Sequence, residues 1–354
     1  MKIYFKKKQY FRLIRRIFYY LLPIILLYFI FQRIDFIELK SNLLKTNLFL
    51  LFLSVSLGPL TTAIGCVRWY VLLTQYHGKK PGFWYLLRNY WIGMVLGYFT
   101  PGSLGWDGYR VIVSGRVYGR HAFNVIIILA EKMIAFITCA SIIVLLSPFL
   151  PNLSSPTIRR IISVFSVALG LVIFFVLFLN FFLRSSIFTS LLSRFESFFS
   201  KRIGPLYVRL KLGQTGFTPY FSIKALMKPF TQADALFYGF ALSTAIPVLG
   251  AVSAHFFFLT VGYHLPIIVN LFVSPLLMFI FLLPISFGSL GIREGSYILI
   301  YGLFGVPAEV ALLVSFYTLF GILLNNALGA LILLASAKKD KDLIKSSAKE
   351  AKSN

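Results

Sequence analysis

Apolar stretches of helical length, separated by short basic segments, make up most of this sequence. A helix that crosses a membrane needs about 17–25 mostly apolar residues. We therefore predict an all-α polytopic membrane protein with about six full transmembrane helices. The expected spans are 17–31, 47–67, 122–147, 161–183, 233–260 and 308–335.

The first span is preceded by a run of Lys and Arg residues, and no small-residue cleavage site follows it. This pattern indicates an uncleaved transmembrane helix, not a signal peptide. The second span is predicted to end at Arg68-Trp69-Tyr70, whose aromatic side chains suit a membrane interface.

Two further apolar stretches, 84–119 and 266–305, are interrupted by glycine-rich breaks. Unpaired backbone groups at membrane depth are tolerated only where protein or a water-filled cavity surrounds them. The arms beside each break are too short to span, so we predict two re-entrant helical hairpins. The alternative for the second hairpin is that residues 266–284 simply cross the membrane. The expected turn residues are Pro101, Gly102, Gly105 and Gly108 in the first hairpin and Gly288, Gly291 and Gly295 in the second.

The two breaks line up at a constant offset of 186 residues. At this offset Gly102-Ser-Leu-Gly105 coincides with Gly288-Ser-Leu-Gly291, and Ala122 coincides with Ala308. Each half then contains an apolar arm, a break, a short arm and a full span. With both chain ends on one side of the membrane, the two hairpins must open to opposite sides, which predicts an inverted-topology repeat. A chance likeness between two glycine turns is the alternative.

This repeat predicts one integral membrane domain over residues 1–354, built from two halves joined by a basic linker. The linker has eight Lys and Arg residues against one Glu, which is typical of a cytoplasmic loop. The expected parts are a first half at about 47–183, the linker 184–229, a second half at about 230–335 and a Lys-rich tail at 336–354.

Composition supports a membrane protein and limits its partners. Of the 354 residues 58% are hydrophobic and 13% are charged, whereas soluble domains have about 25% charged residues. The net charge of +24 lies mainly in runs that flank apolar spans. This placement predicts cytoplasmic termini in a multi-pass protein of the cytoplasmic membrane, and no nucleic-acid partner. The two cysteines, Cys66 and Cys139, have no ligand spacing, so we expect no metal and no other cofactor.

Six charged residues are predicted to lie inside or near the helix bundle, where ionisable groups are costly and indicate a site. In the functional interpretation the two arginines bind the phosphate of a lipid head group, and the carboxylates orient them. In the structural interpretation the same residues form ion pairs that cap broken helix ends. The six are Asp107, Arg110, Glu131, Lys132, Arg293 and Glu294.

Four segments carry a resemblance to a known family: Arg68-Trp69, residues 101–110, Glu131-Lys132 and residues 284–295. Together they resemble the lysylphosphatidylglycerol synthase transmembrane region family, which is also called flippase-like. Two departures stand out: Trp106 replaces a glycine of the family pattern, and Lys132 replaces an arginine. The first puts close backbone approach at that turn in doubt, and the second keeps the charge without the bidentate fork.

The resemblance implies a membrane domain that handles lipids. The chain ends at Asn354 without a soluble aminoacyltransferase domain, so lysine transfer to lipid is not expected of it. The leading hypothesis is a lipid translocase that moves a phospholipid or lipid-linked head group through a midplane site between the two hairpins. The alternatives are an integral membrane enzyme, with Asp107 or Glu131 as general base, and a partner subunit or scaffold for a lipid-synthesis enzyme.

The expected partner is an anionic phospholipid or a polyprenyl-phosphate-linked lipid. A lipid-synthesis enzyme and a second copy of the chain are the candidate protein partners. No phosphate-binding loop of the Gly-x-x-x-x-Gly-Lys-[Ser/Thr] type occurs in the sequence, so ATP hydrolysis by that route is excluded.

Overall fold

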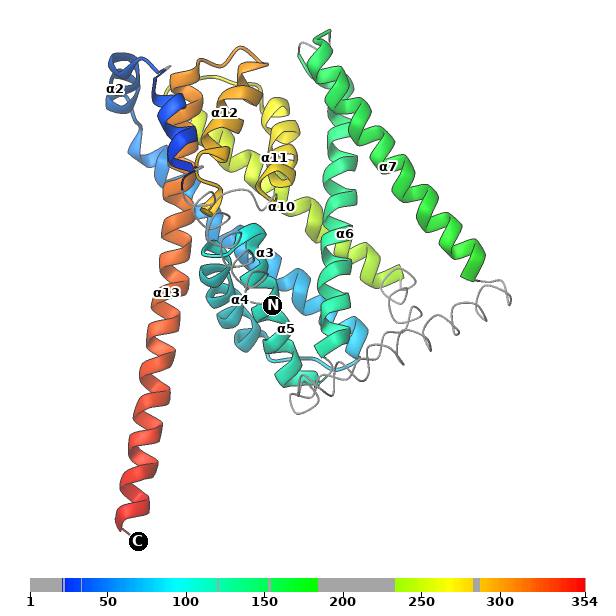
Figure 1. The fold of residues 1–354 in the computed structure, drawn as a ribbon, viewed down its shortest axis with the longest axis vertical. Helices are drawn as coiled ribbons and strands as arrows, with labels where there is room; N and C mark the ends of the chain where they lie inside the picture. The colour runs from blue at the N-terminus through cyan, green and yellow to red at the C-terminus, as the bar shows by residue number, and fades with distance from the viewer. Residues whose placement is uncertain are drawn as a thin grey trace, which may run out of the picture.

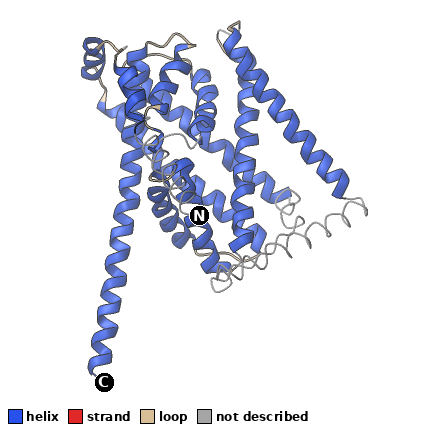
Figure 2. Ribbon diagram, viewed as in Figure 1, coloured by secondary structure: helices blue, strands red, loops and turns tan. Residues whose placement is uncertain are grey.

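Helices account for every regular element that the computed structural model describes (Figure 2). The described residues are 21, 23–32, 34–119, 121–151, 154–183, 233–282 and 287–353. The linker predicted at 184–229 and most of the basic N-terminus lie outside them. The predicted all-α fold class is therefore confirmed for the described part of the chain.

Four helices follow one another in each half in the same order. In the first half they are α3 (Leu48–His77), α4 (Phe83–Tyr98), α5 (Leu104–Tyr118) and α6 (His121–Leu146). In the second half they are α10 (Ala233–Thr260), α11 (Ile267–Leu282), α12 (Ile292–Gly302) and α13 (Ala308–Ser353). The remaining described helices are α2 (Phe36–Leu44), α7 (Pro156–Leu183) and the short 3₁₀ turns η1 (Pro101–Ser103), η2 (Ser147–Phe149) and η5 (Phe287–Ser289).

Four helical segments of the described chain are long and apolar enough to cross a membrane, which makes this a multi-pass membrane protein. They are Leu48–His77, Phe123–Phe149, Ala233–Thr260 and Ala308–Ala335, and each contains or closely matches a predicted span. The predicted span 161–183 lies within α7, and the predicted span 17–31 is described only in part.

The predicted end of the second span near residue 67 is wrong. Helix α3 continues to His77 and ends where Gly78 adopts a left-handed conformation with φ 68°. Trp69 is fully buried and Arg68 nearly so, because this part of α3 packs against other helices instead of meeting a membrane interface.

The two helix pairs α4–α5 and α11–α12 are the arms expected on either side of the breaks. At a rise of about 1.5 Å per residue, even a 16-residue arm is only about 24 Å long, against a hydrocarbon core of about 30 Å. Figure 1 places α4 and α5 in the lower part of the body and α11 and α12 in the upper part. In that view α6 runs upward along the chain and α13 runs downward.

The predicted offset of 186 residues recurs in the backbone of the two breaks. Turn η1 begins at residue 101 and η5 at residue 287. Gly102 and Gly288 both have φ 56°, and the serines that follow them, Ser103 and Ser289, have φ 59° and 58°. Positive φ is uncommon for serine. Two breaks with this same unusual pair of residues have the same local construction.

The two breaks lie close together. The ring of Tyr98, the last residue of α4, lies so close to the second break that a Cβ at Gly288 would be 2.9 Å from its Cζ atom. At the crossing of α3 and α10, Ser54 Oγ donates to the carbonyl of Ser253 at 2.6 Å, and Ser253 Oγ donates to the carbonyl of Ser54 at 3.1 Å. These contacts join the two halves.

Close approach of α4 to α5 depends on glycine. A Cβ built at Gly97 would lie 2.7 Å from Cβ of Trp106 and 3.4 Å from its backbone nitrogen. We expect Gly97→Ala to separate these helices and to destabilise the protein by about 1–3 kcal/mol, the usual cost of overpacking. Thermal unfolding in detergent micelles measures this loss.

Gly170→Ala in α7 is the matched control, because nothing lies within 4 Å of a Cβ built there. This change replaces glycine by a better helix former, so we expect it to be neutral or to stabilise by up to about 1 kcal/mol. Equal stability of the two variants would contradict the close packing of α4 on α5.

Candidate functional site

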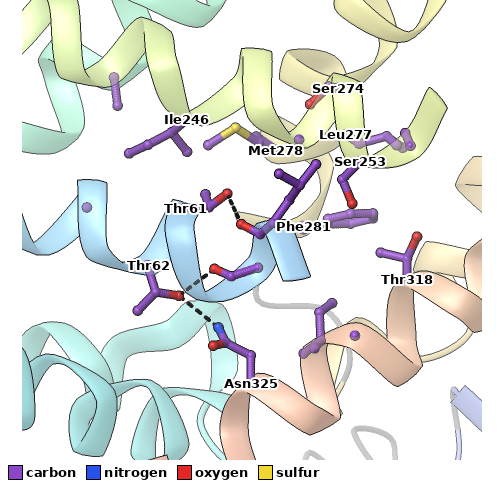
Figure 3. A pocket seen from close by; sticks show the side chains of 18 of the residues that line it. Thr61, Thr62, Ile246, Ser253, Ser274, Leu277, Met278, Phe281, Thr318 and Asn325 are labelled. Atoms are coloured by element: carbon purple, nitrogen blue, oxygen red, sulfur yellow. Dashed lines mark hydrogen bonds between the residues drawn. The ribbon is translucent and has the colours of Figure 1, made fainter. Parts of the chain in front are cut away.

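A cavity of about 470 Å³ lies between the two halves of the repeat. Its lining includes residues from each of the eight helices α3–α6 and α10–α13. Figure 3 shows part of the wall, with Thr61 and Thr62 on α3, Ser253 on α10 and Thr318 on α13. Most of the lining side chains are apolar, and charged residues enter it from α3, α5 and α6.

Five charged side chains form a continuous row of alternating sign beside this cavity. Arg110 is at the centre and donates to both carboxylate oxygens of Glu131, at 3.1 and 2.9 Å, and to Asp107 at 2.8 Å. Glu131 also accepts from Arg68 at 2.6 Å. Asp107 also pairs with Lys132 at 2.8 Å. The row therefore runs Arg68–Glu131–Arg110–Asp107–Lys132.

Local helix geometry accounts for this row. Asp107 and Arg110 are three residues apart on α5, so their side chains share one face. Glu131 and Lys132 are neighbours on α6 and diverge, one toward Arg110 and the other toward Asp107. Asp107 also lies in the first turn of α5, where the helix dipole favours a negative charge.

The row becomes more exposed toward one end. The side chains of Arg110 and Glu131 are each 2% exposed, that of Asp107 is 14% exposed and that of Lys132 is 30% exposed. Buried charges without partners are strongly destabilising, so the central pair must keep its partners for the fold to survive. Lys132 is the member of the row that is free to change partner.

Aromatic rings surround the guanidinium of Arg110. Its central carbon lies 4.8 Å from the ring centroid of Trp106 and 5.6 Å from those of Trp69 and Tyr90. Such cation–π contacts are most favourable where water is excluded. Gly93 and Gly97 of α4 leave room for Trp106. The tryptophan that replaces a glycine of the family pattern therefore packs on glycines of the neighbouring helix and covers Arg110.

The charged residues of the second break form a separate pair. Arg293 donates to Glu294 Oε1 from Nε at 3.2 Å and from Nη2 at 2.8 Å. Glu294 Oε2 accepts the backbone N–H of Gly291 at 2.6 Å and so caps the start of α12. Both side chains are buried, and neither lines the cavity. This geometry is the one that the structural interpretation predicts for this pair.

The structure thus brings four of the six predicted site residues together and keeps Arg293 and Glu294 apart from them. The sequence prediction missed Arg68 as a member of the charged row. It belongs to the Arg-Trp pair that carries the family resemblance, and this signal marked it, but its position near the end of a predicted span suggested an interface.

The predicted turn residues have different roles. Pro101 begins η1, and Gly102, Gly288 and Gly291 have positive φ, which favours glycine. The N–H of Gly105 donates to Thr100 Oγ1 at 2.7 Å. Gly108 lies within α5 and Gly295 within α12, and a Cβ at either would meet no close atom.

Residues 14–329 match the family model described as the lysylphosphatidylglycerol synthase TM region. The chain belongs to this family. The match covers all eight helices of the repeat up to residue 329 of α13, and so includes the whole charged row. This member of the lysylphosphatidylglycerol synthase transmembrane family is therefore a membrane protein of the flippase-like type. No curated protein and no solved structure matches the chain.

The central position of Arg110 predicts its contribution to stability. Arg110→Gln leaves Glu131 and Asp107 each with one cation fewer in a buried site, so we expect a loss of about 3–5 kcal/mol. Thermal unfolding in detergent measures this loss.

Lys132→Gln in this family member is the comparison, because Lys132 is partly exposed and Asp107 keeps Arg110 as a partner. We expect this change to cost no more than about 1 kcal/mol. If the Lys132 variant were the less stable of the two, Arg110 would not be the centre of the row.

Proposed function

We propose that this protein is a lipid translocase of the cytoplasmic membrane, and that the cavity between its halves takes the polar head group of the lipid. One observation carries the proposal: a single cavity is lined by all eight helices of two similar halves and has a charged row on one wall. The substrate would be an anionic phospholipid or a polyprenyl-phosphate-linked lipid.

The proposed arrangement in the membrane is an inverted repeat of two re-entrant hairpins. The short arms, the matching breaks and the opposite directions of α6 and α13 (Figure 1) support it. In transporters built from inverted repeats, discontinuous helices meet near the membrane midplane around the substrate. The contact between Tyr98 and Gly288 brings the two breaks together in a way that suits this arrangement.

The proposed path keeps charged and apolar parts of a lipid in matching surroundings. The head group would lie at the charged wall, while the rest of the lining, from residues such as Ile246, Leu277 and Met278, suits hydrocarbon (Figure 3). The positive-inside rule places both chain ends and the basic linker in the cytoplasm. The first hairpin would then open to the cytoplasm and the second to the outside.

The ion pairs favour translocation over an enzyme that uses these carboxylates. A general base must be free to take a proton from its substrate. Glu131 is held by Arg68 and Arg110, and Asp107 by Arg110 and Lys132. A carboxylate held by two cations gives up much of its basicity.

Filling the cavity tests the proposal. Gly321 of α13 lines the cavity, and a Cβ there would meet Val55 and Phe257 only at ordinary van der Waals distances of 3.7 and 3.8 Å. We expect Gly321→Leu to fold, to occupy part of the cavity and to slow translocation at least about tenfold, which needs a barrier only about 1.4 kcal/mol higher. The measurement is head-group exchange in proteoliposomes, with fluorescent phosphatidylglycerol and a fluorescent polyprenyl-phosphate lipid in separate arms.

Gly170→Leu is the matched control for this assay. It makes the same change in an apolar helix, at an exposed position of α7 outside the cavity, and it should exchange lipid at the wild-type rate. Exchange by wild-type protein that does not exceed that of empty liposomes would overturn the proposal. Equal exchange by both leucine variants would show that lipid does not pass through this cavity.

A further inference from the structure

The walls of the cavity differ in the kind of hydrogen bond that they offer. The charged wall presents N–H groups from Arg68, Arg110 and Lys132. Within the described part of the chain, Nε of Arg68, Nε of Arg110 and Nε1 of Trp106 are buried without a hydrogen-bond partner. All three are donors. This end of the cavity therefore lacks acceptors.

The charged wall also lacks negative charge. Among the described residues the row has three cations, Arg68, Arg110 and Lys132, against two carboxylates. One positive charge is left without a counterion in a mostly apolar cavity, where uncompensated charge is costly. An occupant with one negative charge would remove this excess.

Lys132 is the cation best placed to meet that occupant. The guanidinium of Arg110 is enclosed by three aromatic rings and bound to two carboxylates. Arg68 is held by Glu131 and by Ser243, which it approaches to 3.1 Å. The Lys132 ammonium has three donors, uses one on Asp107 and is 30% exposed.

The remaining polar wall offers the opposite kind of hydrogen bond, because its hydroxyl protons are already used. Ser274 donates to the carbonyl of Pro247, and Thr318 donates to that of Val314. Tyr301 donates to Asn270 Oδ1. A hydroxyl has one proton and two lone pairs, so these groups present only acceptors to the cavity. The same holds for Ser54, Ser253, Thr61 and Thr62, each of which donates to a backbone carbonyl.

We infer that the cavity selects a lipid whose head group is a singly charged phosphodiester carrying hydroxyl groups, such as a glycerol or a sugar. This inference rests on the proposed function and narrows its substrate. Lys132 contacts the phosphate, which supplies the missing acceptor and the missing negative charge. The head-group hydroxyls donate to the lone pairs of Ser274, Thr318 and their neighbours.

Other head groups satisfy only part of this wall. A zwitterionic head group leaves the excess positive charge in place, and a cationic one increases it. A phosphomonoester or diphosphate brings more negative charge than the row can neutralise. A simple alkyl phosphodiester matches the charge and leaves the acceptor wall without donors, at a cost of about 0.5–1.5 kcal/mol for each hydrogen bond not formed.

Direct binding to the full-length protein in non-ionic detergent tests the inference. The probes are short-chain phosphatidylglycerol, phosphatidylethanol, phosphatidylcholine and phosphatidic acid, with native mass spectrometry as the readout. We expect phosphatidylglycerol to bind at least about tenfold tighter than phosphatidylcholine, since a hydrogen bond to a charged group contributes about 1.5–3 kcal/mol. Its advantage over phosphatidylethanol should be about threefold to tenfold.

Variants identify the residues responsible. Lys132→Gln should lose most of the preference for phosphatidylglycerol over phosphatidylcholine, and Lys132→Arg, which keeps the charge, should retain it. Lys80→Gln removes a lysine from the exposed turn outside the cavity and should bind like wild type. Ser274→Ala combined with Thr318→Val should reduce the preference for phosphatidylglycerol over phosphatidylethanol while leaving the preference over phosphatidylcholine intact.

Equal affinity for phosphatidylglycerol and phosphatidylcholine, or unchanged selectivity in Lys132→Gln, would overturn the inference. Two added arms separate the sources of the phosphodiester: a polyprenyl-phosphoryl sugar, and soluble glycerophosphoglycerol without acyl chains. Tight binding of the soluble diester alone would contradict a lipid substrate. Selective binding without exchange in proteoliposomes would remove the proposed translocation and leave the selectivity standing, whereas exchange of every lipid at one rate would do the reverse.

Discussion

The buried row of alternating charges is the constraint on which the rest of this structure depends. Each charge at its centre is tolerable only because two of opposite sign lie beside it, and these partners come from three helices, α3, α5 and α6. The helices must therefore keep their relative positions to within hydrogen-bond distance. The aromatic rings around Arg110 and the glycines beneath Trp106 serve the same requirement, since they exclude water and let α4 approach α5.

The two halves have a common backbone and different chemistry. At the offset of 186 residues Lys132 corresponds to Thr318 and Arg68 to Ala254, and all four line the cavity. The first half thus supplies the cations and the second half supplies neutral oxygens or methyl groups at equivalent positions. A symmetric frame with unlike side chains gives the cavity two different walls, and this difference allows it to orient an asymmetric molecule such as a lipid head group.

The breaks illustrate the same divergence. The N–H groups of Gly105 and Gly291 are equivalent in the repeat, and neither can be left unpaired inside an apolar bundle. The first donates to the hydroxyl of Thr100 and the second to the carboxylate of Glu294. Because Glu294 is committed to this cap and to Arg293, the charged pair of the second break is used to hold the backbone. The first break has a neutral cap, and its Asp107 and Arg110 remain available to the charged row.

Sequence alone determined the all-helical membrane class, four of the long helices, the positions of both breaks and their offset. Apolar periodicity and glycine placement are local properties, so they can be recognised without knowing which helices touch. The family membership followed from four short segments for a related reason, because the residues of each motif lie on one turn or one break. Tertiary structure alone decided how the charges are shared out. Asp107, Arg110, Glu131 and Lys132 come together because α5 and α6 pack side by side, and Arg68 joins them because α3 extends beyond its predicted end into the bundle. Pairing between side chains on different helices depends on packing distances, and these are not written in the order of residues along the chain.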